Sequence, residues 1–307
     1  MTLPRRVRPG ATCLITRRCT QRTFLLVPRG ITREVFAYLL AHLAERYGVL
    51  VHAAVVMTNH YHLVITDTRG RYPDFLRDLD SLLTRVLNAE YGRREALWSS
   101  ARPNVVELLT DESIWQALSY TITNPVKAGL VRTPSEWPGF RTSPRDVLAG
   151  TQFIPRPKAR FFRDSRAPEQ AEWTVTVPPA LSSMTAVAYV DELTQRVGAR
   201  VREKREEMRR GGRSFLGARR VKKQRRTSRP KSPGQPRGRV PTIACHDPAR
   251  RREEAQELCR WRSQYREARR CWLEGESEAE FPFGTFHMAR LPGVRCERAP
   301  PPWQRAA

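Results

Sequence analysis

Two kinds of hydrophobic pattern follow each other through the first half of the chain. Apolar and β-branched residues in short runs indicate strands, and apolar residues recurring every three or four positions indicate helices. Residues 32–48 show the helical spacing, which ends at Gly48, a residue that commonly terminates helices. The patterns predict strands at 11–19, 49–57, 60–66 and 104–109, and helices at 32–48, 73–92 and 111–123, the last capped by Asp111.

The order of these elements predicts the fold class. Only Thr58 and Asn59 separate the two middle strands, and a break this short favours a hairpin. A strand-helix-strand-strand-helix-strand-helix order with a central hairpin favours an α+β protein. We therefore expect a ferredoxin-like antiparallel sheet with helices packed on it.

The second half of the chain has a different character. After residue 148 the sequence becomes rich in proline and loses its periodicity, and a charged helical pattern follows at 187–210. These shifts predict a first domain at 1–148, a Pro-rich connector at 149–190, a charged helix with a basic linker at 187–245, and a small helical segment at 246–307.

The last of these segments contains three aromatic residues with two open interpretations. Trp261, Tyr265 and Trp272 could stack on nucleic-acid bases. Trp261, Tyr265 and Ala268 also fall at helical spacing, which favours a small packed core instead.

Net charge changes the picture more than any other global property. The chain of 307 residues carries 55 Lys+Arg against 31 Asp+Glu, a formal net charge of +24. A strongly cationic surface attracts phosphate polymers, with an anionic membrane surface as the competing partner. No apolar run approaches the roughly 18 residues of a membrane span, and the N-terminus lacks the apolar region of a secretory signal. We expect a cytoplasmic, nucleoid-associated protein with no membrane partner.

The densest positive charge lies in residues 218–240, with ten basic residues and no acidic one. This composition predicts a segment that is disordered when free, so that the fold carries a basic, partly disordered C-terminal extension. Non-specific phosphate binding is the favoured interpretation, and specific recognition of a DNA hairpin is the alternative. The candidate DNA-binding residues are Arg219, Arg220, Lys222, Lys223, Arg225 and Arg226.

The six cysteines indicate no stabilising cross-links. They are scattered and include no C-x-x-C pair, so neither a disulfide framework nor a zinc ribbon is expected. We interpret them as reduced thiols.

The candidate chemistry begins with two histidines in the stretch VVMTNHYHLVIT, residues 55–66. Side chains alternate between the two faces of a strand, so His60 and His62 project together. Two imidazoles so placed can bind one metal ion. The alternative is a pair of ordinary sheet histidines with local hydrogen bonds.

A second group of polar residues lies in SYTITNPVKAGLV. Tyr120 and Asn124 are four residues apart, so they share a helix face. Tyr120 lies about 200° around the helix from Leu118, which with Ile122 belongs to the apolar stripe. The tyrosine therefore points away from its helix's own core stripe. Pro125 disfavours the α conformation at Asn124, so the helix is expected to fray or kink there.

Taken together, VMTNHYHLVI and YTITNPVKAGLV resemble motifs of the IS200-like single-tyrosine transposases. The chain is more similar still to the REP-associated tyrosine transposases, members of the HUH nuclease superfamily, and EWPGFRTSP extends the likeness. The resemblance covers about residues 8–146. One position departs from the family, which often has proline before the Asn-His pair where this chain has Thr58.

The resemblance implies a function and a role for each matching residue. His60 and His62 match the pair that binds a divalent cation, Mg²⁺ or Mn²⁺; Asn124 matches a third polar ligand, and Tyr120 the catalytic tyrosine. Two imidazoles and an amide are softer ligands than the all-oxygen sites that Mg²⁺ favours, and Mn²⁺ tolerates this mixture. Asn59 matches a motif residue that we interpret as turn-forming.

The resemblance implies a metal-dependent single-strand DNA endonuclease and strand transferase that acts on hairpin-bearing DNA through a 5′-phosphotyrosine intermediate. Two alternatives stay open: a catalytically idle, domesticated DNA-binding protein, and a basic RNA-binding protein whose histidine pair is accidental. The sequence is compatible with a homodimer and leaves open whether the active site is shared between chains.

Overall fold

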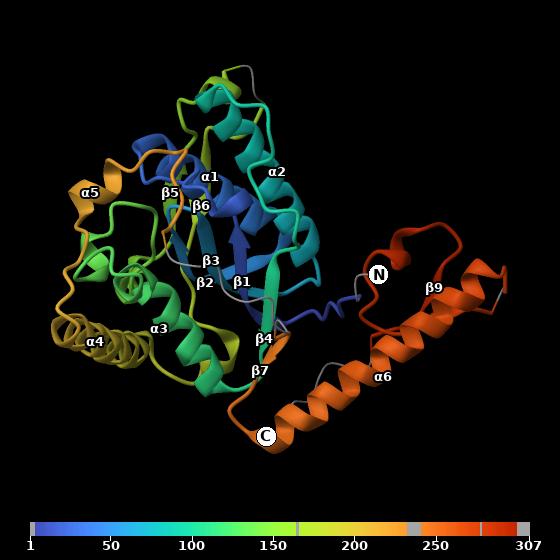
Figure 1. The fold of residues 1–307 in the computed structure, drawn as a ribbon. Helices are drawn as coiled ribbons and strands as arrows, with labels where there is room; N and C mark the ends of the chain where they lie inside the picture. The colour runs from blue at the N-terminus through green and yellow to red at the C-terminus, as the bar shows by residue number, and fades with distance from the viewer. Residues whose placement is uncertain (1–3, 164–165, 232–240, 277, 300–307) are drawn as a thin grey trace.

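A computed structural model describes residues 4–163, 166–231, 241–276 and 278–299. Its centre is a five-stranded sheet with helices on both faces (Figure 1). The strands of this sheet are β1 (Ala11–Arg18), β2 (Val49–Val56), β3 (His60–Asp67), β4 (Asn104–Leu108) and β7 (Ile243–Ala244). The α-helices are α1 (Gly30–Tyr47), α2 (Tyr72–Tyr91), α3 (Asp111–Lys127), α4 (Ala186–Arg210), α5 (Ala218–Lys222) and α6 (Pro248–Leu273).

Shorter elements fill the connections between these. Two further strand pairs are formed by β5 (Gln152–Pro155) with β6 (Gln170–Trp173), and by β8 (Glu280–Phe281) with β9 (Arg295–Cys296). The 3₁₀ turns are η1 (Thr20–Arg22), η2 (Pro134–Glu136), η3 (Pro144–Ala149), η4 (Arg160–Phe162), η5 (Pro179–Leu181) and η6 (Met288–Arg290).

The strand order of the main sheet is β2-β3-β1-β4-β7. The first four strands pair antiparallel, as the sequence predicts, and β2 and β3 form the predicted hairpin. The expectation of a wholly antiparallel sheet was wrong, because β7 adds to β4 in the parallel direction and makes the sheet mixed. A two-residue strand this far along the chain has no periodicity of its own, so the pattern could not reveal it.

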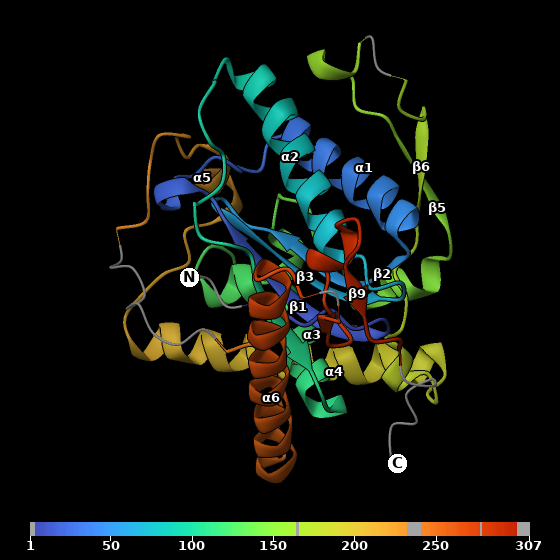
Figure 2. The same ribbon diagram turned by 90° about the vertical axis from the view of Figure 1, so that its right-hand side faces the viewer.

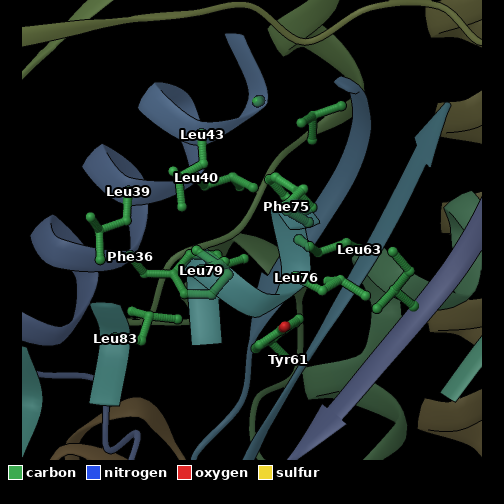
Figure 3. Packing of buried hydrophobic residues seen from close by; sticks show 14 of the residues in the cluster. Phe36, Leu39, Leu40, Leu43, Tyr61, Leu63, Phe75, Leu76, Leu79 and Leu83 are labelled. Atoms are coloured by element: carbon green, nitrogen blue, oxygen red, sulfur yellow. The ribbon is translucent and has the colours of Figure 1, made fainter. Parts of the chain in front are cut away.

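Helices α1 and α2 cover one face of the sheet and bury the larger core. Their apolar stripes meet the side chains that β3 sends to this face, among them Tyr61 and Leu63 (Figure 3). Phe36 of α1 and Phe75 of α2 are fully buried there. Each such side chain contributes about 1.5–3 kcal/mol by leaving water, so this layer fixes the orientation of β3.

Helices α3 and α4 form two further layers on the opposite face (Figures 1 and 2). The predicted stripe of α3, including Leu118 and Ile122, packs against Val64 of β3 and Tyr189 of α4. Alternate residues of β3 therefore serve different layers. Tyr61 and Leu63 face α1 and α2, whereas Val64 faces α3 together with the other even-numbered positions.

Both ends of α3 differ from the prediction. Its N-cap is Thr110, whose side chain accepts a hydrogen bond from the Ser113 backbone N–H, so Asp111 is the first helical residue and not the cap. The helix also does not end near Asn124: it continues through Pro125 to Lys127. The turn that contains Pro125 is held by burial, because the adjacent Val126 is fully buried in an apolar cluster.

Part of the basic run also differs from expectation. In the part of residues 218–240 that the structure describes, 218–231, the chain forms α5 and follows the core. Val221 is fully buried, and the Phe24 backbone N–H donates to the Ser228 carbonyl at 2.9 Å. Disorder is therefore not shown for 218–231, and residues 232–240 lie outside the described residues.

Helix α6 forms a small unit with the β8-β9 pair. The ring of Trp261 stacks on that of Tyr265 at 5.5 Å, and Ala268 packs with Phe281 and Met288. The packed core expected from the spacing of these residues is therefore confirmed. In Figure 2 this unit lies beside the lower part of α2.

Two properties of the whole described chain follow. All six cysteines are free. None of the helices in the described ranges is both long and apolar enough to span a bilayer.

Candidate functional site

The even-numbered face of β3 carries the two histidines. His60 begins the strand, His62 follows two positions later, and both face the α3 layer because they share the orientation of Val64. Their ring centroids lie 4.8 Å apart with the rings nearly perpendicular. The predicted strand geometry is thus present, and the pair lies beneath the C-terminal half of α3.

Helix α3 brings the other two predicted residues to the same place. The ring of Tyr120 meets the ring of His62 edge to face, with centroids 5.2 Å apart. Asn124, one turn later, places its Nδ2 atom 3.2 Å from Nε2 of His62. His60, His62, Tyr120 and Asn124, 64 positions apart at most, therefore form one cluster between the sheet and α3.

The hydrogen bonds of the histidines determine which ring nitrogens are free. Nδ1 of His60 lies 2.7 Å from Oδ1 of Asn59, whose Nδ2 donates to the Arg22 carbonyl at 2.9 Å. Since Oδ1 can only accept, Nδ1 of His60 must carry the proton. The neutral ring then has its lone pair on Nε2, the nitrogen that a metal would bind.

His62 is arranged in the same way. Its Nδ1 lies 2.8 Å from Oγ1 of Thr16, the residue directly opposite it on β1, and its Nε2 faces the amide donor of Asn124. An accepting Nε2 requires the proton on Nδ1, which donates to the threonine hydroxyl. A hydrogen bond on the far nitrogen is the usual way in which proteins orient a metal-binding histidine.

Burial keeps both imidazoles neutral. Desolvation lowers the pKa of His60 to about 4, with a further contribution from the Arg18 cation and opposition from a hydrogen bond with Asn124. Desolvation also lowers the pKa of His62 well below its ordinary value, helped by His60, Arg18 and Lys127. At neutral pH both rings therefore present lone pairs rather than positive charge.

Tyr120 combines access with a cationic neighbour. Its side chain is half-buried, and its hydroxyl forms no hydrogen bond with any residue that the structure describes. The Nζ atom of Lys127 lies 4.6 Å from the centre of its ring. Burial lowers the pKa of Lys127, and the cations of Arg200 and Lys204 lower it further.

The sequence analysis missed Lys127 and Thr16, and it interpreted Asn59 only as a turn-forming residue. Lys127 follows Tyr120 by seven residues, a helical spacing that could have identified it. Thr16 had no local signal, because its place opposite His62 depends on the pairing of β1 with β3. Asn59 does sit in the hairpin turn, but its side chain also orients His60.

A third histidine on the sheet has a structural role. Nδ1 of His52 lies 2.8 Å from the Thr176 carbonyl, and its Nε2 lies 2.8 Å from Oγ1 of Thr66. Both ring nitrogens are therefore occupied within the protein. His52 is a satisfied core histidine. It differs from His60 and His62 in its partners, because the side chain that approaches these two is Asn124, the predicted third metal ligand.

The predicted basic residues lie beyond the C-terminal end of α3. Backbone N–H groups of Leu216 and Gly217 donate to the carbonyls of Gly129 and Leu130, which holds α5 against that end. Arg226 lies 4.1 Å over the ring of Tyr91. The remaining predicted residues are exposed: Arg219, Arg220, Lys222, Lys223 and Arg225. Their DNA-binding role stays a prediction.

Comparison with solved structures finds similar folds among transposases. A REP-associated tyrosine transposase bound to a REP hairpin matches over 48% of this chain and 86% of its own, with 22% sequence identity and a TM-score of 0.41. A crystal structure of a protein described as a transposase from Deinococcus radiodurans R1 matches over 39% of this chain and 95% of its own, with 18% identity and a TM-score of 0.29. The similarity spans about half of the chain.

Comparisons of the sequence with protein-family models and with curated proteins give no match.

Proposed function

We propose that this protein is a metal-dependent endonuclease and strand transferase of transposase type that acts on single-stranded, hairpin-bearing DNA. The observation that carries the proposal is the cluster of His60, His62, Asn124 and Tyr120. Two imidazole lone pairs, an amide and a phenol without an internal partner meet on one face of the sheet. We further propose that β1 to β4 with α1 and α2 are the ferredoxin-like core of an HUH nuclease.

The donor set fits a divalent cation. Among the described residues no group of three or more His, Cys, Asp and Glu side chains could hold a metal, so a cation would need the Asn124 amide oxygen as its third protein ligand. That amide now presents its nitrogen to His62, and a half-turn of its terminal torsion would present the oxygen. Nε2 of His60 and of His62 would supply the other positions. Nitrogen and amide-oxygen ligands suit Mn²⁺, and Mg²⁺ is the alternative.

The reaction follows from the properties of a phosphodiester. A bound cation would neutralise a non-bridging phosphate oxygen and so lower the barrier to attack by several kcal/mol. In the proposed step the oxygen of Tyr120 forms a bond to phosphorus, the bond from phosphorus to the 3′ oxygen breaks, and the phenol proton passes to solvent. The 5′ phosphate is then joined to Tyr120, and the other strand end takes a proton to become a 3′-OH.

The same bond allows rejoining without ATP. The phosphotyrosine ester conserves the energy of the broken phosphodiester, so a second 3′-OH can displace Tyr120 in the reverse sense. Lys127, which lies over the tyrosine ring, would stabilise the negative charge of the phosphate during both steps.

The rest of the proposal concerns organisation and surroundings. Residues 1–148 would be the catalytic domain, with 149–190 as a connector, 187–245 as a charged helix and basic linker, and 246–307 as a separate helical segment. The partners would be single-stranded or hairpin DNA, with a homodimer as one arrangement, in a cytoplasmic, nucleoid-associated location.

The test is formation of a covalent adduct. Purified protein is incubated with Mn²⁺ and a single strand that carries a hairpin, labelled at one end or the other, and protein-linked DNA is separated under denaturing conditions. We expect label to be retained only from the strand portion that carries the 5′ phosphate. Tyr120→Phe should form no adduct. His60→Ala should form little adduct, and Mn²⁺ should no longer increase its amount.

His246 supplies the matched control, because it is exposed and lies outside the cluster. His246→Ala should behave as the unmodified protein does. An adduct that persists in Tyr120→Phe would contradict the proposal. DNA binding without any adduct would favour an idle DNA-binding protein, and metal-independent RNA binding alone would favour the RNA-binding alternative.

A further inference from the structure

A large cavity lies away from the proposed active site. It has a volume of about 850 Å³ and lies between the first turns of α2, the N-terminal residues 4–7 and the C-terminal half of α6. Helix α2 covers the face of the sheet opposite α3, so the cavity and the histidine cluster are on different faces. Its volume is typical of sites that bind small molecules.

Ion pairs between distant segments hold the walls of the cavity together. Arg290, after α6, forms a two-pronged ion pair with Asp74 of α2. Arg6 of the N-terminal segment pairs with Glu257 of α6 at 2.7 Å and also with Glu254. Three parts of the chain that are far apart in sequence therefore build one cavity.

The lining is strongly cationic. It contains six arginines and a single acidic residue, Asp80, which already pairs with Arg17 at 2.9 Å. Two of the six are paired with carboxylates outside the lining: Arg77 with Asp74 and Asp78, and Arg270 with Glu267 and Glu274. In the described ranges neither Arg102 nor Arg269 forms an ion pair. Burial lowers the pKa of Arg5, and the nearby Arg102 cation lowers it further. These guanidinium groups lack the anion that would compensate them.

Aromatic rings supply the other half of the lining. Tyr72 of α2 is buried at the wall, and Tyr265 and Phe286 are half-buried on the facing side. The ring of Tyr265 is held by stacking on Trp261, with a centroid distance of 5.5 Å and an angle of 29°. The same ring meets that of Phe281 at 5.4 Å, so two neighbours fix Tyr265 at the edge of the cavity, where an aromatic ring can contact a planar ligand.

We propose that this cavity, the α2–α6 pocket, binds a nucleotide unit, with its phosphate on the unpaired arginines and its base among the aromatic rings. Arginine recognises phosphate through paired N–H donors, and aromatic side chains stack on any base. An acidic peptide would form ion pairs with the arginines, but it would not explain the aromatic rings in the lining.

The nucleotide could be free or part of a single strand, and the strand is favoured by the exposed Arg266 at the margin of the lining. The pocket would give the protein a nucleic-acid contact on the face opposite the proposed active site. This inference does not depend on the chemistry of Tyr120, so His60→Ala protein should bind the nucleotide as well as the unmodified protein does.

The experiment uses the full-length protein and a ten-nucleotide strand that contains 5-iododeoxyuridine, cross-linked by light and mapped by mass spectrometry. We expect cross-links to peptides that contain Tyr265 or Tyr72, and we expect thymidine 5′-monophosphate to compete for them. The double variant Arg102→Ala/Arg269→Ala should weaken binding of this nucleotide by about tenfold or more, since the charge-assisted hydrogen bonds to the phosphate are lost.

Arg260→Ala is the matched control. Arg260 is an exposed arginine on the same helix, nine residues from Arg269 and therefore on the opposite side, so its loss removes the same single charge from α6 as the Arg269→Ala half of the double variant. We expect no change in nucleotide binding from this control. The competition arm requires no variant, so it tests the proposal even if the double variant does not fold.

Each outcome has a defined meaning. Competition by the mononucleotide without a cross-link from the strand would support the pocket and assign it to free nucleotides. Cross-links confined to other regions with no competition would overturn the inference. Equal displacement by poly-glutamate and by the nucleotide, at the same ionic strength, would also overturn it, because the pocket would then bind any anion.

Discussion

Replacement of Thr16 by valine removes one hydrogen bond and tests how the sheet orients its proposed metal ligand. The threonine hydroxyl lies 2.8 Å from Nδ1 of His62, and valine has the same shape without the acceptor. His62 is only 4% exposed, so water cannot easily replace the lost partner. The Nδ1–H group would be left unsatisfied, or the proton would move to Nε2 and block metal binding.

The size of the effect follows from this geometry. An unsatisfied buried donor costs about 1–3 kcal/mol of folding stability. Loss of a partner that orients a ligating histidine typically costs about 10–100-fold in metal affinity. We therefore expect Thr16→Val protein to fold, with a somewhat lower free energy of unfolding, and to bind Mn²⁺ about 10–100-fold more weakly.

Calorimetric titration with Mn²⁺ measures the affinity directly, and Thr12→Val is its control. Thr12 lies on the same strand and face, and its hydroxyl is 2.8 Å from that of Thr66, which is not one of the three proposed ligands. This control should lose some stability and keep its metal affinity. If Thr16→Val and Thr12→Val bind Mn²⁺ with equal affinity, Thr16 does not orient His62 as a metal ligand.

Three other changes test separate parts of the structure. Lys127→Met should slow adduct formation on Tyr120 by roughly tenfold without unfolding the protein, because one phosphate-directed cation is lost, measured by a time course of protein-linked DNA. Arg290 holds the pKa of Asp74 at about 2, so the stability from this pair is complete above about pH 4 and is lost as the pH falls towards 2. The denaturation midpoint of the unmodified protein should therefore fall across this pH range, and that of Asp74→Asn should change less. Leu118→Ala, at a fully buried position of α3, should lower the free energy of unfolding by about 2–5 kcal/mol in urea titrations, and a loss below about 1 kcal/mol would show that α3 is not packed as described.

Local periodicity was sufficient to predict which residues of each pair share a face, and the resemblance to the transposases was needed to bring the two pairs into one site. Alternation along a strand places His60 and His62 on one face, and the spacing of Tyr120 and Asn124 places them on one side of a helix. Each rule acts within a few residues, which is why it can be read from sequence. The α+β class and the antiparallel pairing of β1 to β4 follow from element order in the same way.

Features that depend on long-range pairing could not be predicted. The contact between Thr16 and His62 follows from the register of two strands, and a shift of one residue would send every side chain to the other face. The addition of β7 to β4 and the packing of Val221 against the end of α3 link residues more than 90 positions apart. The composition of residues 218–231 indicated their positive charge but not that they pack near the C-terminal end of α3.

The central claim is that Tyr120 is the residue that becomes joined to DNA. The most direct measurement is mass spectrometry of the peptide that carries the nucleotide after adduct formation and digestion of protein and DNA. The chain has eight tyrosines, so the result discriminates among them. The account predicts a 5′-phosphonucleotide on Tyr120, and a nucleotide attached to any other residue would contradict it.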